Sequence, residues 1–278
     1  MQHQTLISAA QLQSELATGK PLVVLDCGFE LSDTGAGERL YTQGHLPQAR
    51  YAHLDKDLSA PKTGRNGRHP LPSQETWARR VGEWGITPST SVVCYDDQGG
   101  VYAARAWWML NWLGHRAVAV LDGGRGAWLA LGAALVDSPA PTASQAPYPT
   151  VAAGMPTIDA DQLLARLGQL TVLDARAPER FRGDVEPLDP VAGHIPGATC
   201  HFFKNNLAAD GRFKSAAELR ALFVPWSQAG EVVHQCGSGV TACHNLLAMA
   251  HAGLTPGTLY GGSWSEWCSD PARPVAKG

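Results

Sequence analysis

The chain carries the same series of landmarks twice, and this internal repeat is the feature that most limits its fold. A short run of Val and Leu ends in Asp26 in the first half and in Asp174 in the second. A Gly-His-Leu/Ile-Pro segment then contains His45 in the first half and His194 in the second. The two pairs are 148 and 149 positions apart. Because two landmarks recur at nearly one offset, we predict a duplicated structural unit of about 120 residues.

Each copy has the pattern of an α/β fold. Short Val-rich runs alternate with apolar helical stretches and with tight Gly or Pro turns. The runs lie at 22–26, 91–95, 171–174 and 231–235, and the helical stretches lie at 101–114 and 240–253. This alternation predicts a doubly wound, mainly parallel sheet flanked by helices in each half. Residues 139–156 are rich in Pro, Ala, Ser and Thr without apolar periodicity, which is typical of a linker. We therefore predict one domain at 1–138 and another at 157–278.

Charge and composition argue against several classes of function. The 278 residues carry a formal net charge of −3 with Lys and Arg scattered, so no basic surface for nucleic acid is predicted. No stretch reaches the roughly 18 apolar residues of a membrane span, and residues 1–13 lack the pattern of a signal peptide. We therefore expect a cytoplasmic protein that binds neither nucleic acid nor membranes. In that compartment the six cysteines would be reduced thiols.

One loop has the residues for nucleophilic chemistry. The segment 236–242 reads Cys-Gly-Ser-Gly-Val-Thr-Ala and lies between a predicted strand and a predicted helix. In an open α/β sheet, ligands bind at the carboxyl ends of the strands. Gly237 and Gly239 allow the backbone to curl so that N–H groups point inward, and such a nest at a helix N-terminus stabilises a thiolate. We therefore predict that Cys236 is a nucleophile rather than a small apolar residue of the core.

A cysteine-dependent phosphatase uses a similar scaffold, but two features of the loop argue against one. Such an enzyme needs an arginine six positions after the cysteine to hold the phosphoryl oxygens, and here that position is Ala242. The loop is also too short to wrap a tetrahedral anion. A compact loop suits a single terminal sulfur atom better.

Three motifs together resemble the tandem rhodanese family. They are the loop 236–242, the paired Gly-His-Leu/Ile-Pro segments, and Gly-Gly-Ser-Trp-Ser-Glu-Trp at 261–267. That family comprises thiosulfate and 3-mercaptopyruvate sulfurtransferases, and the likeness covers nearly the whole chain. It implies two rhodanese-like domains, of which only the C-terminal one is catalytic. It also implies that Cys236 takes a sulfane sulfur from a small donor, keeps it as a persulfide, and passes it to cyanide or a thiol.

The resemblance implies further residues of the donor site. Arg180 matches the family position whose guanidinium binds the anionic group of the donor, a role that suits the planar fork of arginine. Arg182 is a second candidate, although a surface role is favoured for it. The loop itself would complete the donor site with Gly237, Gly239, Val240 and Thr241. No cofactor and no metal are predicted, because the histidines lack the spacing of zinc ligands.

A histidine is expected to act with the loop serine. The mercaptopyruvate branch of the family has been given a Ser–His–Asp arrangement in which Ser238 and a histidine of the first domain take part. His45 would be that histidine, and Asp33 and Glu38 are both candidates for its acidic partner. The alternative for His45 is a structural role, because His194 occupies the same place in the second half.

The first half lacks a sulfur carrier in the matching loop. Alignment from the strand places Asp96 at the position of the catalytic cysteine, and alignment from the helix places Asp97 there, because this loop is one residue longer. Cys94 falls within the strand and is predicted to be buried. Asp26 and Asp174 occur in both halves and are predicted to cap the turns that follow them.

Two features indicate different donors. Gly237 and Ser238 are neutral where thiosulfate-type relatives place basic residues, which favours 3-mercaptopyruvate. Asp189 stands where the mercaptopyruvate branch places a second arginine, which favours thiosulfate unless Arg182 supplies the missing charge. Because the loop touches the reacting sulfur, we expect 3-mercaptopyruvate as the main donor. Thiosulfate:cyanide sulfur transfer is the alternative.

Two other classes of function stay open. A degenerate rhodanese-like domain can act as a non-enzymatic binding or regulatory module, which the intact cysteine loop argues against. A thiol-disulfide oxidoreductase would need Cys243 to resolve Cys236. Seven residues of separation would place Cys243 about two turns into the helix, pointing away. Trp264 and Trp267 are predicted to pack in the core, although Trp264 is also a candidate wall of the pocket.

Overall fold

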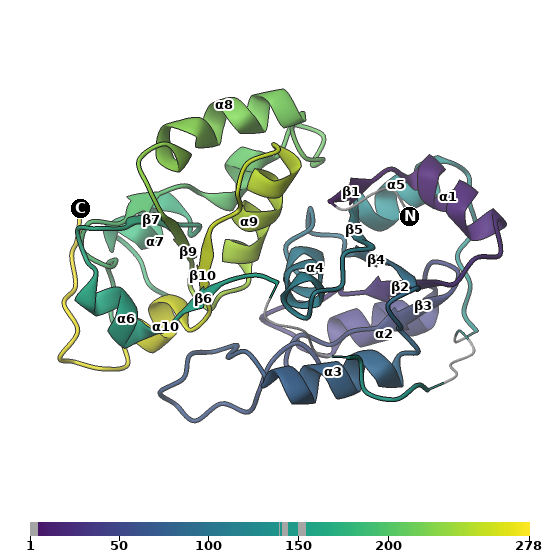
Figure 1. Cartoon of the computed structure of the whole chain (residues 1–278), viewed down its shortest axis with the longest axis horizontal. Coiled ribbons are helices and arrows are strands. Elements are labelled where there is room, and N and C mark those ends of the chain that lie inside the picture. Colours follow the sequence, from purple (N-terminus) through teal and green to yellow (C-terminus); the bar gives the residue numbers. More distant parts are fainter. Residues whose placement is uncertain (1–4, 139, 141–143, 150–153) are drawn as a thin grey trace. The chain divides into compact units, whose positions relative to one another are not determined.

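A computed structural model describes residues 5–138, 140, 144–149 and 154–278 (Figure 1). These residues form two compact units. Unit 1 takes its residues from 1–59, 72–155 and 211–213, and unit 2 takes them from 60–71, 156–210 and 214–278. Two segments therefore belong to the unit opposite to their half of the sequence. These are 60–71, which is part of unit 2, and 211–213, which is part of unit 1.

Unit 1 is built on a parallel sheet. Its strands are β1 (Leu6–Ile7), β2 (Leu22–Asp26), β3 (Ala49–Tyr51), β4 (Ser91–Tyr95) and β5 (Val118–Leu121). Its helices are α1 (Ala9–Ala17), α2 (Ala36–Gln43), α3 (Gln74–Glu83), α4 (Ala103–Trp112) and α5 (Gly124–Ala130). The strand order is β1-β5-β4-β2-β3, and each neighbouring pair is parallel.

Unit 2 repeats this plan. Its strands are β6 (Thr157–Ile158), β7 (Thr171–Asp174), β8 (Thr199–Cys200), β9 (Val232–Gln235) and β10 (Thr258–Tyr260). Its helices are α6 (Ala160–Ala165), α7 (Pro178–Arg182), the 3-10 helix η1 (Phe203–Asn206), α8 (Ala216–Ser227), α9 (Thr241–His251) and α10 (Ser263–Trp267). The order β6-β10-β9-β7-β8 matches that of unit 1 strand for strand. The predicted pair of doubly wound parallel sheets is therefore confirmed.

Helices cover both faces of the second sheet (Figure 1). On one face, Leu163 of α6 and the two tryptophans of α10 pack against Val172 and Val233, and all five side chains are buried. On the other face, α8 and α9 pack together, and the ring of His234 faces Phe223. Trp264 and Trp267 are 0% exposed, which confirms their predicted place in the core.

The aspartates that end β2 and β7 cap the turns that follow, as predicted. Asp26 accepts the backbone N–H of Gly28 at 3.0 Å, and Asp174 accepts that of Arg176 at 2.9 Å. Because both carboxylates are buried, these bonds replace the water that the turn amides lose on folding. Each turn therefore leaves its strand at a fixed angle, and in unit 2 it leads directly to the helix that carries Arg180.

Part of the predicted linker 139–156 lies outside the described residues. Within it, residues 144–149 belong to unit 1, where the hydroxyl of Tyr148 lies 3.1 Å from Nδ1 of His115. Among the described residues, no helix combines the length and apolar character needed to cross a bilayer.

Candidate active site

Cys236 follows directly after β9, and its sulfur is surrounded by backbone amides. The N–H of Gly239 donates to Sγ at 3.1 Å and that of Ser238 at 3.5 Å, while α9 begins at Thr241. These donors and the positive end of the helix favour negative charge on the sulfur. Cys236 itself is 2% exposed, so the backbone replaces solvent as the partner of that charge. The amide nest predicted from the glycine spacing is therefore present.

Gly239 is required by this geometry. Its φ is +77°, which side-chain-bearing residues rarely adopt. A Cβ at this position would lie 2.3 Å from the carbonyl oxygen of Gly261, well inside contact distance. The loop can therefore turn its amides toward the sulfur only with glycine here.

The segment after β10 holds the cysteine loop in place. Oγ of Ser263 accepts the N–H of Cys236 at 3.1 Å, and the carbonyl of Cys236 accepts the N–H of Trp264 at 2.9 Å. The carbonyl of Gly237 accepts the N–H of Ser265 at 2.9 Å. These bonds explain why the motif at 261–267 accompanies the cysteine loop in the sequence, since it fixes the loop from behind.

Two guanidinium groups lie beside the loop at Gly237. A Cβ on this glycine would lie 2.7 Å from Nη2 of Arg68 and 3.4 Å from Nη1 of Arg180. The side chains of Arg68 and Arg180 are 24% and 17% exposed, so parts of both reach solvent. Arg180 therefore lies beside the nucleophilic loop, and Arg68, from the segment 60–71, is a second cation that the sequence reasoning did not identify.

Buried carboxylates hold both arginines. Nε and Nη2 of Arg68 donate to the two oxygens of Asp189 at 2.9 and 3.3 Å. Nη2 of Arg180 donates to Glu186 at 2.7 Å and to Asp189 at 3.2 Å. The side chains of Asp189 and Glu186 are only 2% and 3% exposed. Asp189 thus joins the two guanidinium groups and fixes their orientation.

The ion pairs continue behind the loop. Arg176 is 3% exposed; it donates to Asp174 at 2.7 Å, and its Nη1 lies 3.6 Å from Glu186. Its guanidinium also lies 4.8 Å from the centre of the Trp264 ring. The network contains equal numbers of carboxylates and guanidinium groups, namely Asp174, Arg176, Glu186, Arg180, Asp189 and Arg68.

His69 is the histidine that meets the loop serine. Its Nδ1 lies 2.8 Å from Oγ of Ser238, and both residues are buried. The sequence assigned this place to His45, and the structure corrects that assignment. His45 belongs to unit 1, where its ring stacks on Tyr41 and its Nδ1 lies 2.9 Å from the Tyr41 carbonyl. His194, from the second Gly-His-Leu/Ile-Pro segment, has the same structural role in unit 2. Its Nδ1 lies 2.8 Å from the Phe181 carbonyl.

The two predicted acidic partners of His45 form surface ion pairs instead. Asp33 pairs with Arg39, and Glu38 lies 3.4 Å from Lys56. All four side chains are more than half exposed. Neither carboxylate is therefore held in the buried setting that a catalytic Ser–His–Asp arrangement requires.

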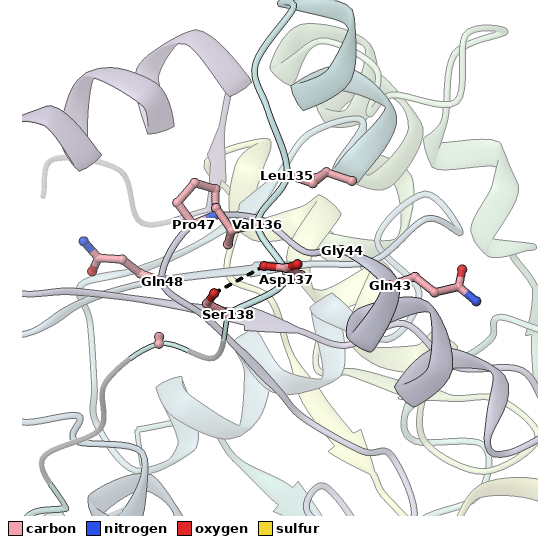
Figure 2. Close-up of a pocket in the computed structure, with 9 residues that line it drawn as sticks. Gln43, Gly44, Pro47, Gln48, Leu135, Val136, Asp137 and Ser138 are labelled. Atoms are coloured by element: carbon pink, nitrogen blue, oxygen red, sulfur yellow. Dashed lines mark hydrogen bonds between the residues drawn. The ribbon is translucent and has the colours of Figure 1, made fainter.

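A pocket lies beside His45, and Figure 2 shows the residues that line it. Backbone hydrogen bonds of 2.8 and 2.9 Å join His45 to Val136 at its edge. Its volume is about 590 Å³, and its lining residues are Gln43, Gly44, Pro47, Gln48, Leu135, Val136, Asp137, Ser138 and Ala140. None of these residues is a candidate site residue of the sequence analysis.

The remaining candidates lie at the ends of helices. Arg182, the last residue of α7, is about half exposed and pairs with Asp184 at 2.7 Å, so it has the surface role that was favoured for it. Val240 is the N-cap of α9, and Thr241 is its first residue. The thiol of Cys243 donates to the Gly239 carbonyl at 3.3 Å. This contact holds Cys243 in the first turn of α9, against the end of the loop.

In unit 1, Asp96 occupies the corresponding loop. It follows β4 directly, and its carboxylate accepts the N–H groups of Gln98, Gly100, Tyr102 and Ala103, each at 2.8 Å. Asp97 is exposed and accepts the N–H of Arg125 at 3.2 Å. Asp96 is therefore the structural counterpart of Cys236. Cys94 is 0% exposed within β4, as predicted.

Comparison with known proteins agrees with the geometry. The model of the rhodanese-like domain matches residues 8–131 and 159–270. The chain belongs to the rhodanese family. This rhodanese is 49% identical to a probable 3-mercaptopyruvate sulfurtransferase of Pseudomonas aeruginosa over 284 residues, with 98% of each chain covered. It is 42% identical to a putative thiosulfate sulfurtransferase of Mycobacterium tuberculosis over 281 residues, with 99% of this chain and 98% of the relative covered.

A solved structure extends the comparison. The 3-mercaptopyruvate sulfurtransferase of Leishmania major superposes with a TM-score of 0.83 at 31% identity, covering 96% of this rhodanese and 75% of that chain. The tandem rhodanese architecture and the sulfurtransferase function expected from the sequence are therefore confirmed.

Arg68 and His69 are the site residues of this rhodanese that sequence reasoning missed. They lie in a Gly-Arg-His-Pro-Leu-Pro segment at 67–72, ahead of Ser73, the N-cap of α3. A signal for them was present, because the second half also has a Gly-Arg pair, at 211–212, ahead of Ser215, the N-cap of α8. The repeated Gly-Arg before a helix start marks 67–72 as part of the duplicated pattern.

Proposed function

We propose that the protein moves sulfane sulfur from 3-mercaptopyruvate through a persulfide on Cys236 to a thiol or to cyanide. The observation that carries the proposal is the amide nest around Sγ, with N–H donors at 3.1 and 3.5 Å. A persulfide has its negative charge on the outer sulfur, and the same donors and helix end would attract that charge. The cytoplasmic location expected from the sequence stays a prediction.

The donor's carboxylate would bind the two arginines beside Gly237. Arg68 and Arg180 each have a partly exposed side chain, and several of their N–H groups are bound to Asp189 and Glu186. A carboxylate in front of this pair would gain charge-assisted hydrogen bonds. It would also be oriented with its thiol toward the cysteine.

The reaction then needs one displacement and one proton movement. The Cys236 thiolate attacks the donor sulfur, a new S–S bond forms, and the C–S bond breaks with its electron pair on carbon as the enolate of pyruvate. The thiol proton must leave the donor sulfur, and a proton must reach the enolate carbon. Ser238 and His69, 2.8 Å apart, are the groups placed for this transfer. In the second half-reaction, cyanide takes the outer sulfur as thiocyanate, or a thiol takes it as a persulfide.

Mass spectrometry tests this proposal directly. Incubation of the protein with 3-mercaptopyruvate should add the mass of one sulfur atom, and cyanide should remove it. Cys236→Ser should lose both the added mass and turnover, because the hydroxyl cannot replace a thiolate at neutral pH. Cys200→Ser, a change at a half-buried cysteine on β8, is the matched control and should keep the full mass gain. Substantial turnover by Cys236→Ser would sink the mechanism.

Thiosulfate is the second candidate donor. The pair of guanidinium groups at the loop favours it, as either could bind sulfonate oxygens. Attack of the Cys236 thiolate on its outer sulfur breaks the S–S bond and releases sulfite, with no proton to be moved. Steady-state rates with the two donors side by side decide between them. A kcat/KM for thiosulfate at or above that for 3-mercaptopyruvate would reverse the assignment while leaving the Cys236 chemistry in place.

A further inference from the structure

The carboxylate of Asp189 is a fixed negative charge directly behind the donor-binding arginines. It accepts two hydrogen bonds from Arg68, at 2.9 and 3.3 Å, and one from Arg180, at 3.2 Å. Its side chain is 2% exposed, whereas the two arginines are 24% and 17% exposed. The arginine side chains are therefore the part of this cluster that solvent and a donor can reach, while the Asp189 carboxylate is covered.

The sum of charges in this network limits what the site can attract. Three guanidinium groups face three carboxylates, so the network is neutral as a whole; its members are Asp174, Arg176, Glu186, Arg180, Asp189 and Arg68. Loop positions 237–239 are Gly-Ser-Gly and add no cation. The reacting Cys236 thiolate would then add one negative charge. A donor with two negative charges thus meets no net positive field to offset its loss of water.

We infer that Asp189 selects the donor by charge, so that the site favours a monoanionic thiol-bearing 2-oxo acid over a dianionic sulfane donor. The inference rests on the proposed role of Cys236. The two candidate donors differ by one unit of charge next to the arginines. Because that extra charge lies close to Asp189 in a largely buried setting, the carboxylate repels the dianion more strongly than the monoanion.

The position of Asp189 also explains how two arginines can lie close together at a site that binds one donor carboxylate. Two unpaired guanidinium groups that close would repel each other. The bridging carboxylate removes that repulsion and fixes both forks at the loop. Asp189 is therefore a positioning residue as well as a source of charge, and a test must separate these two effects.

The test measures kcat/KM for thiosulfate and for 3-mercaptopyruvate in the full-length protein with cyanide as acceptor. Asp189→Asn keeps the shape of the side chain and removes its charge. We expect the ratio of kcat/KM for thiosulfate to that for 3-mercaptopyruvate to rise at least tenfold, which corresponds to about 1.4 kcal/mol. The rise should shrink as KCl is added, because salt screens the charge that distinguishes the donors.

Two further variants separate charge from position. Asp189→Glu keeps the charge but moves the arginines, so both donors should lose rate while their ratio stays within about threefold of wild type. Asp184→Asn removes an exposed carboxylate that pairs with Arg182, and its ratio should stay within about twofold. If Asp189→Asn does not fold, as judged by thermal unfolding, Asp189→Ser replaces it with the same expected rise.

The outcomes are distinct. An equal loss for both donors in Asp189→Asn, or a fall in the ratio, would overturn the inference, because Asp189 would then only hold the arginines. Wild-type protein that forms no persulfide with either donor would overturn the proposed function and the inference with it. A raised ratio in Asp189→Asn with unchanged ratios in Asp189→Glu and Asp184→Asn supports selection by charge.

Discussion

Asp96 occupies in the first sheet the position that Cys236 occupies in the second. Each residue follows directly after the central strand of its sheet, and each side chain accepts backbone N–H groups from the loop that leads into a helix. In unit 1 the acceptor of these N–H groups is a carboxylate, whereas in unit 2 it is the sulfur that we propose as the sulfur carrier. The same kind of nest thus holds a structural side chain in one copy and the proposed nucleophile in the other.

This relationship predicts separate effects on stability and activity. Asp96→Asn should lower the free energy of unfolding by about 2–4 kcal/mol, because an amide leaves some of the four N–H donors unpaired and turns its own N–H₂ toward others. The kcat/KM of the folded variant should change less than about threefold. Urea unfolding and assays well below the melting temperature measure the two quantities.

Asp97→Asn is the matched control for this experiment. Its carboxylate is exposed and accepts the N–H of Arg125, so the loss should stay below about 1 kcal/mol. A drop of more than about tenfold in the activity of folded Asp96→Asn would contradict a purely structural role for the unit 1 loop.

His69 should matter for one donor and not for the other. Mercaptopyruvate requires a proton to leave sulfur and another to reach carbon, while thiosulfate requires neither. His69→Gln should therefore lower kcat for 3-mercaptopyruvate by about 10²–10⁴ and leave kcat for thiosulfate within a few-fold. Ser238→Ala, which removes the hydroxyl 2.8 Å from the imidazole, should show the same split. Equal losses with both donors would indicate that the pair only shapes the loop.

Arg68 should act on donor binding. Arg68→Lys keeps the charge but loses the fork that donates twice to Asp189, so KM for either donor should rise roughly 10- to 100-fold with a smaller change in kcat. Arg65→Lys, an exposed arginine of the same segment, is the control and should leave KM unchanged. The idea fails if the two variants have the same KM.

The catalytic unit should lose stability in mild acid. Burial lowers the pKa of His234, two residues before the nucleophile, to about 3. The unfolded chain takes up a proton near pH 6.5 and the native state does not, so stability is full above that pH and falls as the pH drops toward 3. Between pH 6 and 4.5, the free energy of unfolding should fall with pH in both proteins, but less steeply in His234→Leu than in wild type. The two slopes should differ by about 1.4 kcal/mol per pH unit. Chemical unfolding at several pH values measures both slopes, and equal slopes would argue against this prediction.

Much of the fold could be predicted because it depends on local pattern. The runs that end in Asp26 and Asp174 become the interior strands β2 and β7, and the glycine loop after β9 becomes the nest, since strand, turn and helix each have a short-range signal. The repeat doubles these signals. Arg180 was named only from the family resemblance, and the structure places it on α7, which follows the turn capped by Asp174.

The rest of the site depends on contacts between segments far apart in the chain. The hydrogen-bonded pair of His69 and Ser238 is separated by 169 residues, and the Arg68–Asp189 pair by 121. The hydrophobic periodicity of a sequence does not indicate which loop contacts the end of which strand. Asp189 was therefore read as a missing arginine. His45 was assigned from the family resemblance and His69 was not considered, although the repeat of the His45 motif at His194 already indicated a structural role.

The exchange of segments between the halves has a consequence for how the protein can be divided. Residues 60–71 of the first half belong to unit 2, and residues 211–213 of the second half belong to unit 1. If two subunits exchanged equivalent elements, the result would be a domain-swapped dimer, which can dissociate on dilution. Here both units belong to one covalent chain, so the exchange does not depend on protein concentration. A fragment that starts at residue 157 would lack the guanidinium of Arg68 and the imidazole of His69. The first half of the chain therefore cannot be removed without removing two side chains of unit 2.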